Sequence, residues 1–277
     1  VKRETEIAAF QPVLFYTVAL ALPGFHASGE RLEDETQAKN VMEACAAAEA
    51  STVKTVERKE KTEKPPALYD LTTLQREANR LLGFTAQQTL DYLQSLYEKK
   101  LTTYPRTDSR YLTSDMADSL PVLVNVAATA MPFASGVPIS CNSGQVINDS
   151  KVSDHHAIIP TQGIKDADLS SLPAGERSLL HLIAARLLCA VGQPYTFAET
   201  AVLMECAGYP FKAKGRAVLH PGWKELDGRY RDTLKNKPDT DREKEAKALP
   251  LLEESQELEV ISASVKEGKT SPPGHFT

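Results

Sequence analysis

The residues best suited to chemistry lie in the segment 101–112, Leu-Thr-Thr-Tyr-Pro-Arg-Thr-Asp-Ser-Arg-Tyr-Leu. Tyr104 precedes Pro105, and a proline ring disfavours the α region for the residue before it. We therefore expect this segment to be an extended strand. Side chains two residues apart on a strand point to one face, about 6.5 to 7 Å apart along the chain. Tyr104 and Arg106 are thus predicted to share a face, whereas on a helix they would diverge.

A tyrosine beside an arginine suits phosphoryl transfer. A free tyrosine hydroxyl has a pKa of about 10, so at neutral pH it is a weak nucleophile. A guanidinium group stabilises the charge that develops on the hydroxyl and on phosphate oxygens, and it can hold a phosphate through two hydrogen bonds. Lys99, Lys100 and Arg110 outnumber the nearby Glu98 and Asp108, which makes the segment locally basic. An isolated Tyr-x-Arg is more often an ordinary strand with exposed charges, so the pair alone establishes no function.

The residues from Tyr104 to Leu112 resemble the active-site segment of type IA DNA topoisomerases, above all that of the topoisomerase III branch. In that family the matching tyrosine attacks a phosphodiester of single-stranded DNA and becomes linked to the 5′ phosphate. The resemblance implies that Tyr104 is the nucleophile and that Arg106 stabilises the phosphate. We expect DNA contacts from the residues around this pair, which are Lys99, Lys100, Thr107, Asp108, Ser109 and Arg110.

A second motif, Ser-Asp-His-His-Ala-Ile-Ile-Pro-Thr at 153–161, contains two adjacent histidines. Neighbouring side chains on a regular element cannot both face one metal ion, and such a pair is usually structural or exposed. The run His-x-Ala-Ile-x-Pro-Thr, however, resembles the family's second hallmark, whose first histidine contributes to DNA binding and to the active site. The resemblance therefore implies a catalytic role for His155, and we assign no role to His156.

Composition and charge indicate a soluble globular protein of one large or two ordinary domains. The chain has 277 residues, of which 42% are hydrophobic and 25% charged. It has no apolar run of about 18 residues, as a membrane-spanning helix requires, and no evident signal peptide. The net charge of −5 argues against indiscriminate coating of DNA, so nucleic-acid contacts must be local.

The cysteines are widely spaced and form no Cys-x-x-Cys pair. This spacing favours reduced, buried thiols in a cytoplasmic protein and disfavours a zinc site. They are Cys45, Cys141, Cys189 and Cys206.

The first part of the chain has a strand, helix, strand pattern. Residues 13–22 are apolar and β-rich, residues 37–50 have apolar side chains at helical spacing, and residues 52–56 are rich in β-branched side chains. The segment 57–64 that follows has seven charged residues among its eight and precedes two prolines. Its composition predicts a linker.

Helical patterns fill the middle of the chain. Thr72-x-x-Gln75 and Thr85-x-x-Gln88 are capping boxes that would open two helices, and Gly83 would end the first of them. Two helices joined by a short turn and followed by the Tyr104 strand predict a winged-helix unit. The run 71–84 also resembles the stretch that precedes the family's tyrosine.

Two more helices are predicted after this unit. Residues 114–130 would form one, capped by Ser114 and with Pro121 in its first turns or at a kink. Residues 171–191 would form the other, with His181 and Arg186 at the surface, ended by Gly192 and Pro194. The intervening residues 133–152 show no clear period and are expected to be irregular.

Strand patterns return after residue 197. They cover 200–206, 211–215, 222–223 and 249–265, while the charged run 229–247, whose function the sequence does not indicate, predicts a flexible hairpin or loop. The predicted fold class is mixed α and β: a discontinuous β-rich arch domain, 1–66 and 195–277, with an inserted helical, winged-helix-like (CAP-like) domain, 67–194, that carries the tyrosine. This organisation resembles the family's arch.

The chain begins and ends about where the family's other modules would attach, which predicts that it is a fragment of a longer protein. Neither the acidic triplet of the family's metal-binding module nor a matching βαβ unit is present. The resemblance therefore implies that magnesium is bound in the intact enzyme by a domain absent from this chain, and no metal site is expected here. The expected partners are single-stranded DNA and the missing metal-binding and arch-closing domains, with no membrane.

The leading hypothesis is the central fragment of a type IA topoisomerase. The intact enzyme would cleave and rejoin one DNA strand through a 5′-phosphotyrosine intermediate and relax or decatenate DNA without ATP. It would act in the bacterial cytoplasm at the nucleoid, and the fragment alone would be inactive. The alternative is a non-catalytic winged-helix protein that binds single-stranded DNA, in which Tyr104 only stacks on a base. A tyrosine recombinase would need dispersed basic residues that the sequence does not show.

Overall fold

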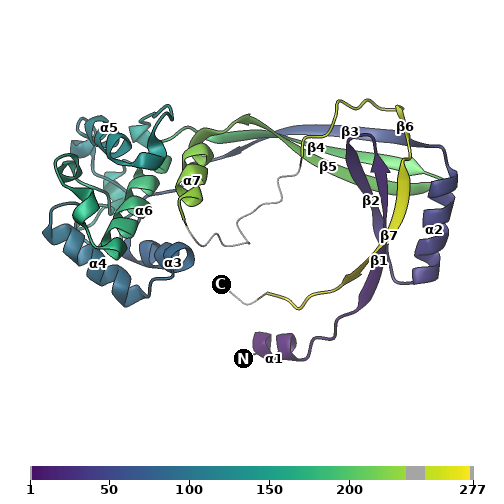
Figure 1. Cartoon of the computed structure of the whole chain (residues 1–277), viewed down its shortest axis with the longest axis horizontal. Coiled ribbons are helices and arrows are strands. Elements are labelled where there is room, and N and C mark those ends of the chain that lie inside the picture. The colour runs from purple at the N-terminus through teal and green to yellow at the C-terminus, as the bar shows by residue number, and fades with distance from the viewer. Residues whose placement is uncertain (1, 235–246, 275–277) are drawn as a thin grey trace. The chain divides into compact units, whose positions relative to one another are not determined.

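The computed structural model describes residues 2–234 and 247–274 (Figure 1). The chain divides into two compact units, each of which we describe by itself. The first, the β-rich unit, comprises 1–61, 197–217 and 244–277, and the second, the helical unit, comprises 62–196 and 218–243. The chain thus runs from β-rich to helical and back to β-rich segments, as the sequence predicted. Over the two described stretches, every helix is too short or too polar to cross a lipid bilayer.

The described residues of the β-rich unit form a sheet with the strand order β6-β3-β4-β5-β2-β1-β7. Strand β1 pairs antiparallel with both β2 and β7. The strands are β1 (Leu14–Leu22), β2 (Phe25–Leu32), β3 (Ala50–Glu63), β4 (Tyr195–Cys206), β5 (Tyr209–His220), β6 (Glu257–Glu259) and β7 (Ser262–Lys269). The helices of this unit are α1 (Lys2–Ala8) and α2 (Glu35–Ala47).

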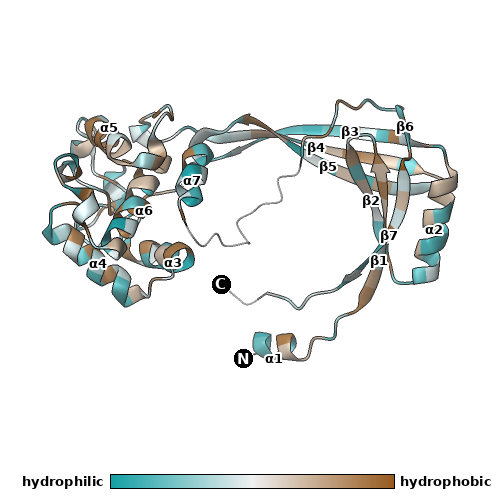
Figure 2. Ribbon diagram, viewed as in Figure 1, coloured by the Kyte–Doolittle hydropathy of each residue, from teal (hydrophilic) through white to brown (hydrophobic). Residues whose placement is uncertain are grey.

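One face of helix α2 completes the core of this unit. Ala38, Val41 and Cys45 are its buried residues, at the spacing of one helical stripe, and they pack with buried residues of β1 such as Val18 and Leu20. Figure 2 shows both hydrophilic and hydrophobic colours on α2, as expected for a helix with one buried face.

The thiols are free, as the sequence predicted. Cys45, Cys189 and Cys206 are buried, and Cys141 is half-buried. Sγ of Cys45 lies 3.6 Å from the carbonyl oxygen of Cys206, and Sγ of Cys206 lies 3.8 Å from that of Cys45. Burial raises the pKa of the Cys45 thiol to about 12, which keeps it protonated and unreactive at neutral pH.

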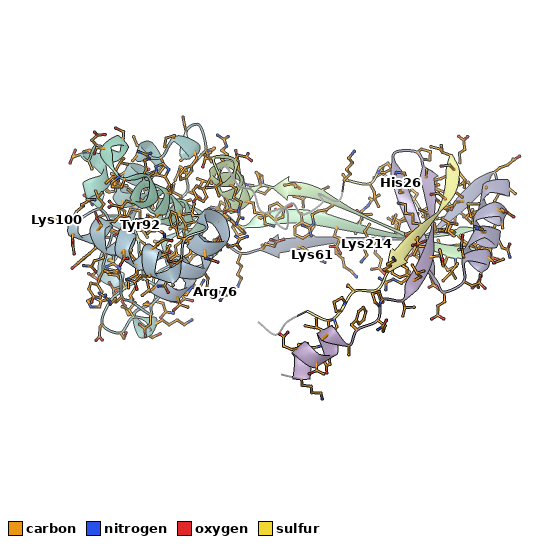
Figure 3. The ribbon with its side chains drawn as sticks, turned by 60° about the horizontal axis from the view of Figure 1, so that its bottom comes forward. His26, Lys61, Arg76, Tyr92, Lys100 and Lys214 are labelled. Atoms are coloured by element: carbon orange, nitrogen blue, oxygen red, sulfur yellow. The ribbon has the colours of Figure 1, made fainter. Side chains whose placement is uncertain are left out.

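The predicted linker at 57–64 is wrong, because β3 continues to Glu63. Most side chains of this stretch are exposed, so charged residues are tolerated on a strand that has little core to face. They also pair along and across the strands: Nζ of Lys61 lies 2.9 Å from the Glu199 carboxylate on β4, and Nζ of Lys59 lies 2.8 Å from that of Glu57. Figure 3 shows Lys61 and, on β5, Lys214 along this part of the sheet.

The helical unit is built around helix α6 (Ala174–Ala190), most of whose side chains are buried. It packs against α3 (Leu71–Leu82), α4 (Ala86–Glu98), α5 (Leu120–Ala130) and α7 (Gly222–Asp232). Short 3-10 turns connect these helices: η1 (Ser114–Met116), η2 (Pro132–Ala134), η3 (Ser143–Gln145), η4 (Asp149–Lys151), η5 (Gln162–Lys165) and η6 (Leu169–Ser171). The irregular segment predicted at 133–152 is confirmed, because it contains only such turns and one isolated bridge, at Ile147.

The caps of α3 and α4, the first two helices of the helical unit, agree in part with the sequence. Thr85 and Gln88 form the predicted capping box of α4, and Gly83 ends α3 with φ of 72°. The box predicted from Thr72 is wrong: Asp70 caps α3, and its carboxylate accepts a hydrogen bond from the Thr73 amide at 2.6 Å. Aspartate is as good an N-cap as threonine, and here it lies one residue before the helix.

Three other predictions need correction. The helix expected from Ser114 begins instead at Leu120, with Pro121 in its first turn, where no proline N–H is needed. Residues 222–223 start α7 rather than a strand: the Trp223 amide donates to the Gln193 carbonyl at 2.8 Å, and its indole N–H donates to the Glu63 carbonyl at 3.3 Å. The run 229–247 begins within α7, and residues 235–246 lie outside the described part of the chain.

Arg186 and His181 are half-buried, not surface residues as predicted. The Arg186 guanidinium lies 4.3 Å from the centroid of the Tyr69 ring, donates to the Tyr69 hydroxyl at 2.9 Å and pairs with Glu77 at 3.5 Å. Burial lowers the pKa of His181, which packs against Phe133. Both polar side chains therefore belong to the packing between helices.

Two glycines of the helical unit test this account of the helix ends. Gly83→Ala forces a Cβ into the left-handed region and should lower stability by about 1 kcal/mol. Gly228 lies inside α7 in open space, so Gly228→Ala should raise stability by roughly 0.5–1 kcal/mol. Thermal and urea unfolding of the two variants measures both. Equal effects of the two substitutions would contradict the assigned helix boundaries.

Candidate active site

The end of helix α4 turns the chain into the segment that carries Tyr104. The Lys100 amide donates to the Tyr97 carbonyl at 2.8 Å, and the Leu101 amide donates to the Leu96 carbonyl at 2.9 Å. These two bonds define a Schellman motif, whose C′ position requires a left-handed backbone. Lys100 occupies that position with φ of 58°. A residue other than glycine costs about 1–2 kcal/mol there, so neighbouring contacts must hold the turn.

Contacts from two other elements hold this turn. The Thr161 hydroxyl donates to the Lys100 carbonyl oxygen, and η5 begins directly after Thr161. On the other side, the carboxylate of Glu176 on α6 pairs with the Lys99 ammonium and accepts from the Ser95 hydroxyl at 2.9 Å. Glu176 is only 7% exposed, so this carboxylate fixes the last turn of α4 against α6.

Beyond the turn, the Tyr104 segment is hydrogen-bonded to the segment 155–161. The Thr103 amide donates to the Ile159 carbonyl at 3.0 Å, and the Thr161 amide donates to the Leu101 carbonyl at 2.9 Å. Further along, the Thr107 hydroxyl donates to the His155 carbonyl at 2.8 Å. The two sequence motifs therefore form one structural unit, although about fifty residues separate them in the chain.

The strand predicted at 101–112 is wrong. The segment contains only isolated bridges, between Thr102 and Pro160 and between Leu112 and Ile147. Pro105 has no amide hydrogen to donate, and side-chain hydroxyls take over much of the bonding between these residues.

The segment nevertheless keeps the alternation of an extended chain. Pro105, Thr107 and Ser109 are buried, whereas Arg106 and Asp108 are exposed. This period of two agrees with the expected placement of Tyr104 and Arg106 on one side of the backbone.

The Tyr104 ring contacts two other rings. Its centroid is 4.1 Å from that of His155, with the planes tilted by 32°, and 5.6 Å from that of Tyr97, with the planes at 85°. Tyr104 is half-buried and His155 is exposed. Among the described residues, the Tyr104 hydroxyl has no hydrogen-bond partner, so its oxygen is available to a ligand.

The basic residues around Tyr104 divide into two kinds. Arg106 and Lys100 are exposed, and their side chains make no hydrogen bond or ion pair within the described stretches. Figure 3 shows Lys100 at the edge of the helical unit. Lys99 instead pairs with Glu176, and Arg110 donates through Nε to the Leu68 carbonyl at 3.1 Å. Arg106 and Lys100 are therefore the cations best placed to meet a phosphate.

The three polar residues after Arg106 hold the loop together. Thr107 donates to the His155 carbonyl, and the Ser109 hydroxyl donates to the Lys151 carbonyl at 2.9 Å. Asp108 is exposed and accepts from the Ser153 hydroxyl at 3.3 Å. DNA contacts from these three residues stay a prediction, and His156, whose Nδ1 lies 2.9 Å from the Ala157 carbonyl oxygen, still has no assigned role.

Sequence reasoning missed two residues of this site. Tyr97 fell on the apolar stripe of a predicted helix, and nothing in its spacing indicated a contact with a ring seven residues later. Glu176 stands near the start of another helix, where an acidic residue is ordinary, so its partnership with Lys99 was not visible.

The described residues do not fit a resident metal ion. No three histidine, cysteine, aspartate or glutamate side chains gather within them as a metal site would require. We therefore derive no step of the chemistry through a metal held by this chain.

The chain is similar to known proteins in both sequence and fold. A family model described as DNA topoisomerase matches residues 1–277. Full-length topoisomerase I from Thermotoga maritima has a similar fold, with a TM-score of 0.70 and 20% identity over 100% of this chain and 44% of that chain. The chain belongs to the type IA DNA topoisomerase family.

Curated relatives place the chain on one branch of this family. DNA topoisomerase 3 of Bacillus subtilis is 37% identical over 289 residues, and that of Bacillus licheniformis is 36% identical over 287 residues. Each alignment covers 99% of this chain and 38% of the relative, so the chain spans about two fifths of the length of these proteins. The resemblance inferred from the two motifs is thereby confirmed.

Two further glycines test how the turn before Tyr104 is held. A Cβ on Gly163, in η5, would lie 2.6 Å from the Lys100 carbonyl oxygen, whereas one on Gly144, in η3, meets nothing within 4 Å. Gly163→Ala should destabilise the helical unit by roughly 1–3 kcal/mol, since backbone must shift. Gly144→Ala should change stability by less than about 0.5 kcal/mol. Urea unfolding compares them, and a silent Gly163→Ala would contradict the close approach.

Proposed function

We propose that this chain supplies the nucleophile and the phosphate-binding arginine of a type IA topoisomerase that cleaves and rejoins one strand of DNA. The observation that carries the proposal is the environment of Tyr104. Its ring contacts two others, its hydroxyl has no partner among the described residues, and Arg106, exposed and without a side-chain partner among those residues, lies two positions away.

The chemistry is a transesterification. The Tyr104 oxygen attacks a phosphorus of single-stranded DNA, the bond from phosphorus to the 3′ oxygen breaks, and the phenolic proton is transferred to that leaving oxygen. The DNA end remains linked through its 5′ phosphate to Tyr104. One phosphodiester replaces another, so the reverse step reseals the strand without ATP.

Arg106 and His155 act on the phosphate in this scheme. The Arg106 guanidinium holds two non-bridging oxygens and stabilises the charge that they gain in the transition state. His155, exposed beside the Tyr104 ring, presents its ring nitrogens to the same phosphate. Lys100 attracts the neighbouring backbone, and Lys99, Thr107, Asp108, Ser109 and Arg110 remain the proposed flanking contacts.

The rest of the activity requires parts outside this chain. Magnesium is held in the intact enzyme by acidic residues of another domain, and arch-closing segments complete the protein. This chain alone is therefore proposed to bind DNA without cutting it. The intact enzyme relaxes or decatenates DNA in the bacterial cytoplasm, at the nucleoid. The domains proposed are 1–66, 67–194 and 195–277, the second of them winged-helix-like.

A non-catalytic role in binding single-stranded DNA is the second candidate. The observation that favours it is the cluster of Tyr97, Tyr104 and His155, because bases of single strands stack on aromatic side chains. In that case Tyr104 would contribute its ring and not its hydroxyl. The following substitution separates the two functions.

Tyr104→Phe, in a full-length type IA topoisomerase carrying this chain, should abolish the covalent complex with DNA. The substitution removes the nucleophilic oxygen but keeps the ring, so affinity for a single-stranded oligonucleotide should change by less than about twofold. Denaturing gel electrophoresis of a labelled oligonucleotide measures the complex, and fluorescence anisotropy measures affinity. A covalent complex that persists in this variant would assign the attack to another residue, with Tyr111 the first to examine.

Arg106→Lys tests the phosphate contact. Lysine keeps the charge but loses the planar fork, so a bidentate contact to the transition state should be lost, and cleavage at saturating DNA should slow by roughly 10- to 1,000-fold. The control is Arg76→Lys, since Arg76 is an exposed arginine on α3 whose side chain has no partner among the described residues (Figure 3). Cleavage at the parental rate by Arg106→Lys would remove Arg106 from the transition state.

A further inference from the structure

We propose that Tyr97 is a positioning residue for Tyr104, an inference that rests on the proposed function. The Tyr97 ring meets the Tyr104 ring at 85° with centroids 5.6 Å apart, which is the edge-to-face arrangement that aromatic pairs prefer. His155 contacts the same ring at 4.1 Å. A ring with neighbours of this kind has fewer open rotamers than an exposed tyrosine, so its hydroxyl is held in place before DNA binds.

The backbone that carries Tyr97 is itself fixed. Tyr97 lies in the last turn of α4, and its carbonyl accepts a hydrogen bond from the Lys100 amide, while the Lys99 amide donates to the Ser95 carbonyl. Ser95 and Lys99, two residues to either side, both contact the buried Glu176 carboxylate. The position of Tyr97 is therefore determined by the packing of α4 on α6, and its contact with Tyr104 carries that constraint to the nucleophile.

Burial alone does not explain a tyrosine at this position. Tyr97 is 39% exposed, while Leu93 and Leu96 on the same helix are fully buried and supply the core contacts. Among the described residues, the Tyr97 hydroxyl has no hydrogen-bond partner. The ring is thus the part of Tyr97 that acts, and phenylalanine should replace it.

The test uses a full-length type IA topoisomerase carrying this chain and a single-stranded oligonucleotide at saturating concentration. Tyr97→Ala should lower the single-turnover cleavage rate roughly three- to tenfold, the range that one aromatic pair supports, with affinity for the oligonucleotide nearly unchanged. Tyr97→Phe should restore the parental rate. Tyr97→Leu keeps an apolar, helix-forming side chain but has no aromatic ring, so it should slow cleavage by the same roughly three- to tenfold. This variant keeps the test valid if Tyr97→Ala does not fold.

Tyr92→Ala is the matched control. Tyr92, labelled in Figure 3, lies on the same helix. It makes an edge-to-face pair with Phe84 at 5.3 Å, whereas the ring contacts of Tyr104 among the described residues are with Tyr97 and His155. Its substitution should leave the cleavage rate unchanged. A cooperative thermal unfolding transition checks that the variant is folded. Parental cleavage by Tyr97→Leu would overturn the proposal, as would weaker DNA binding at an unchanged rate, which would make Tyr97 a base-stacking residue. The proposed function fails in a different experiment: a covalent complex with DNA in the Tyr104→Phe variant would contradict it, whatever the Tyr97 variants do.

Discussion

The candidate site depends on the hydrogen bonds that join the Tyr104 segment to the segment 155–161. Backbone and threonine side-chain bonds connect them on both sides of the tyrosine, from Thr103 to Ile159 and from Thr107 to His155. Without these bonds, the residues between 101 and 112 would be a surface loop with neither a regular strand nor a core of its own. With them, the rings of Tyr104 and His155 meet, and Arg106, two residues after the tyrosine, is exposed.

The entry to this segment is a strained turn that the surrounding helices hold. Lys100 adopts the left-handed conformation that glycine usually occupies, and the Glu176 carboxylate and the Thr161 hydroxyl secure the residues around it. Backbone strain of this kind is common near functional groups, where the position of the following residues matters more than local stability. The same turn places Tyr97 against Tyr104, so one arrangement holds both the backbone and the ring of the proposed nucleophile.

Local sequence signals predicted much of this structure. Thr85, Gln88 and Gly83 marked helix ends correctly, and two short motifs identified the family. The errors arose where tertiary contacts outweigh composition: a charged stretch that looked like a linker is a strand with paired charges, and Trp223 begins a helix. Within the site, the motif residues were visible from sequence, but Tyr97 and Glu176 were not, because their partners lie on other elements. The sequence also could not show that Lys99 forms an ion pair with Glu176, whereas Arg106 has no side-chain partner among the described residues.

The proposed function requires the helical unit to present the Tyr104 oxygen to a DNA phosphate. Its most direct test is to trap the cleavage complex of a full-length type IA topoisomerase carrying this chain, digest it, and locate the nucleotide by mass spectrometry. The account predicts one modified peptide, with a DNA 5′ phosphate on Tyr104. A nucleotide on Tyr111 or any other side chain, or a linkage through a 3′ phosphate, would contradict it.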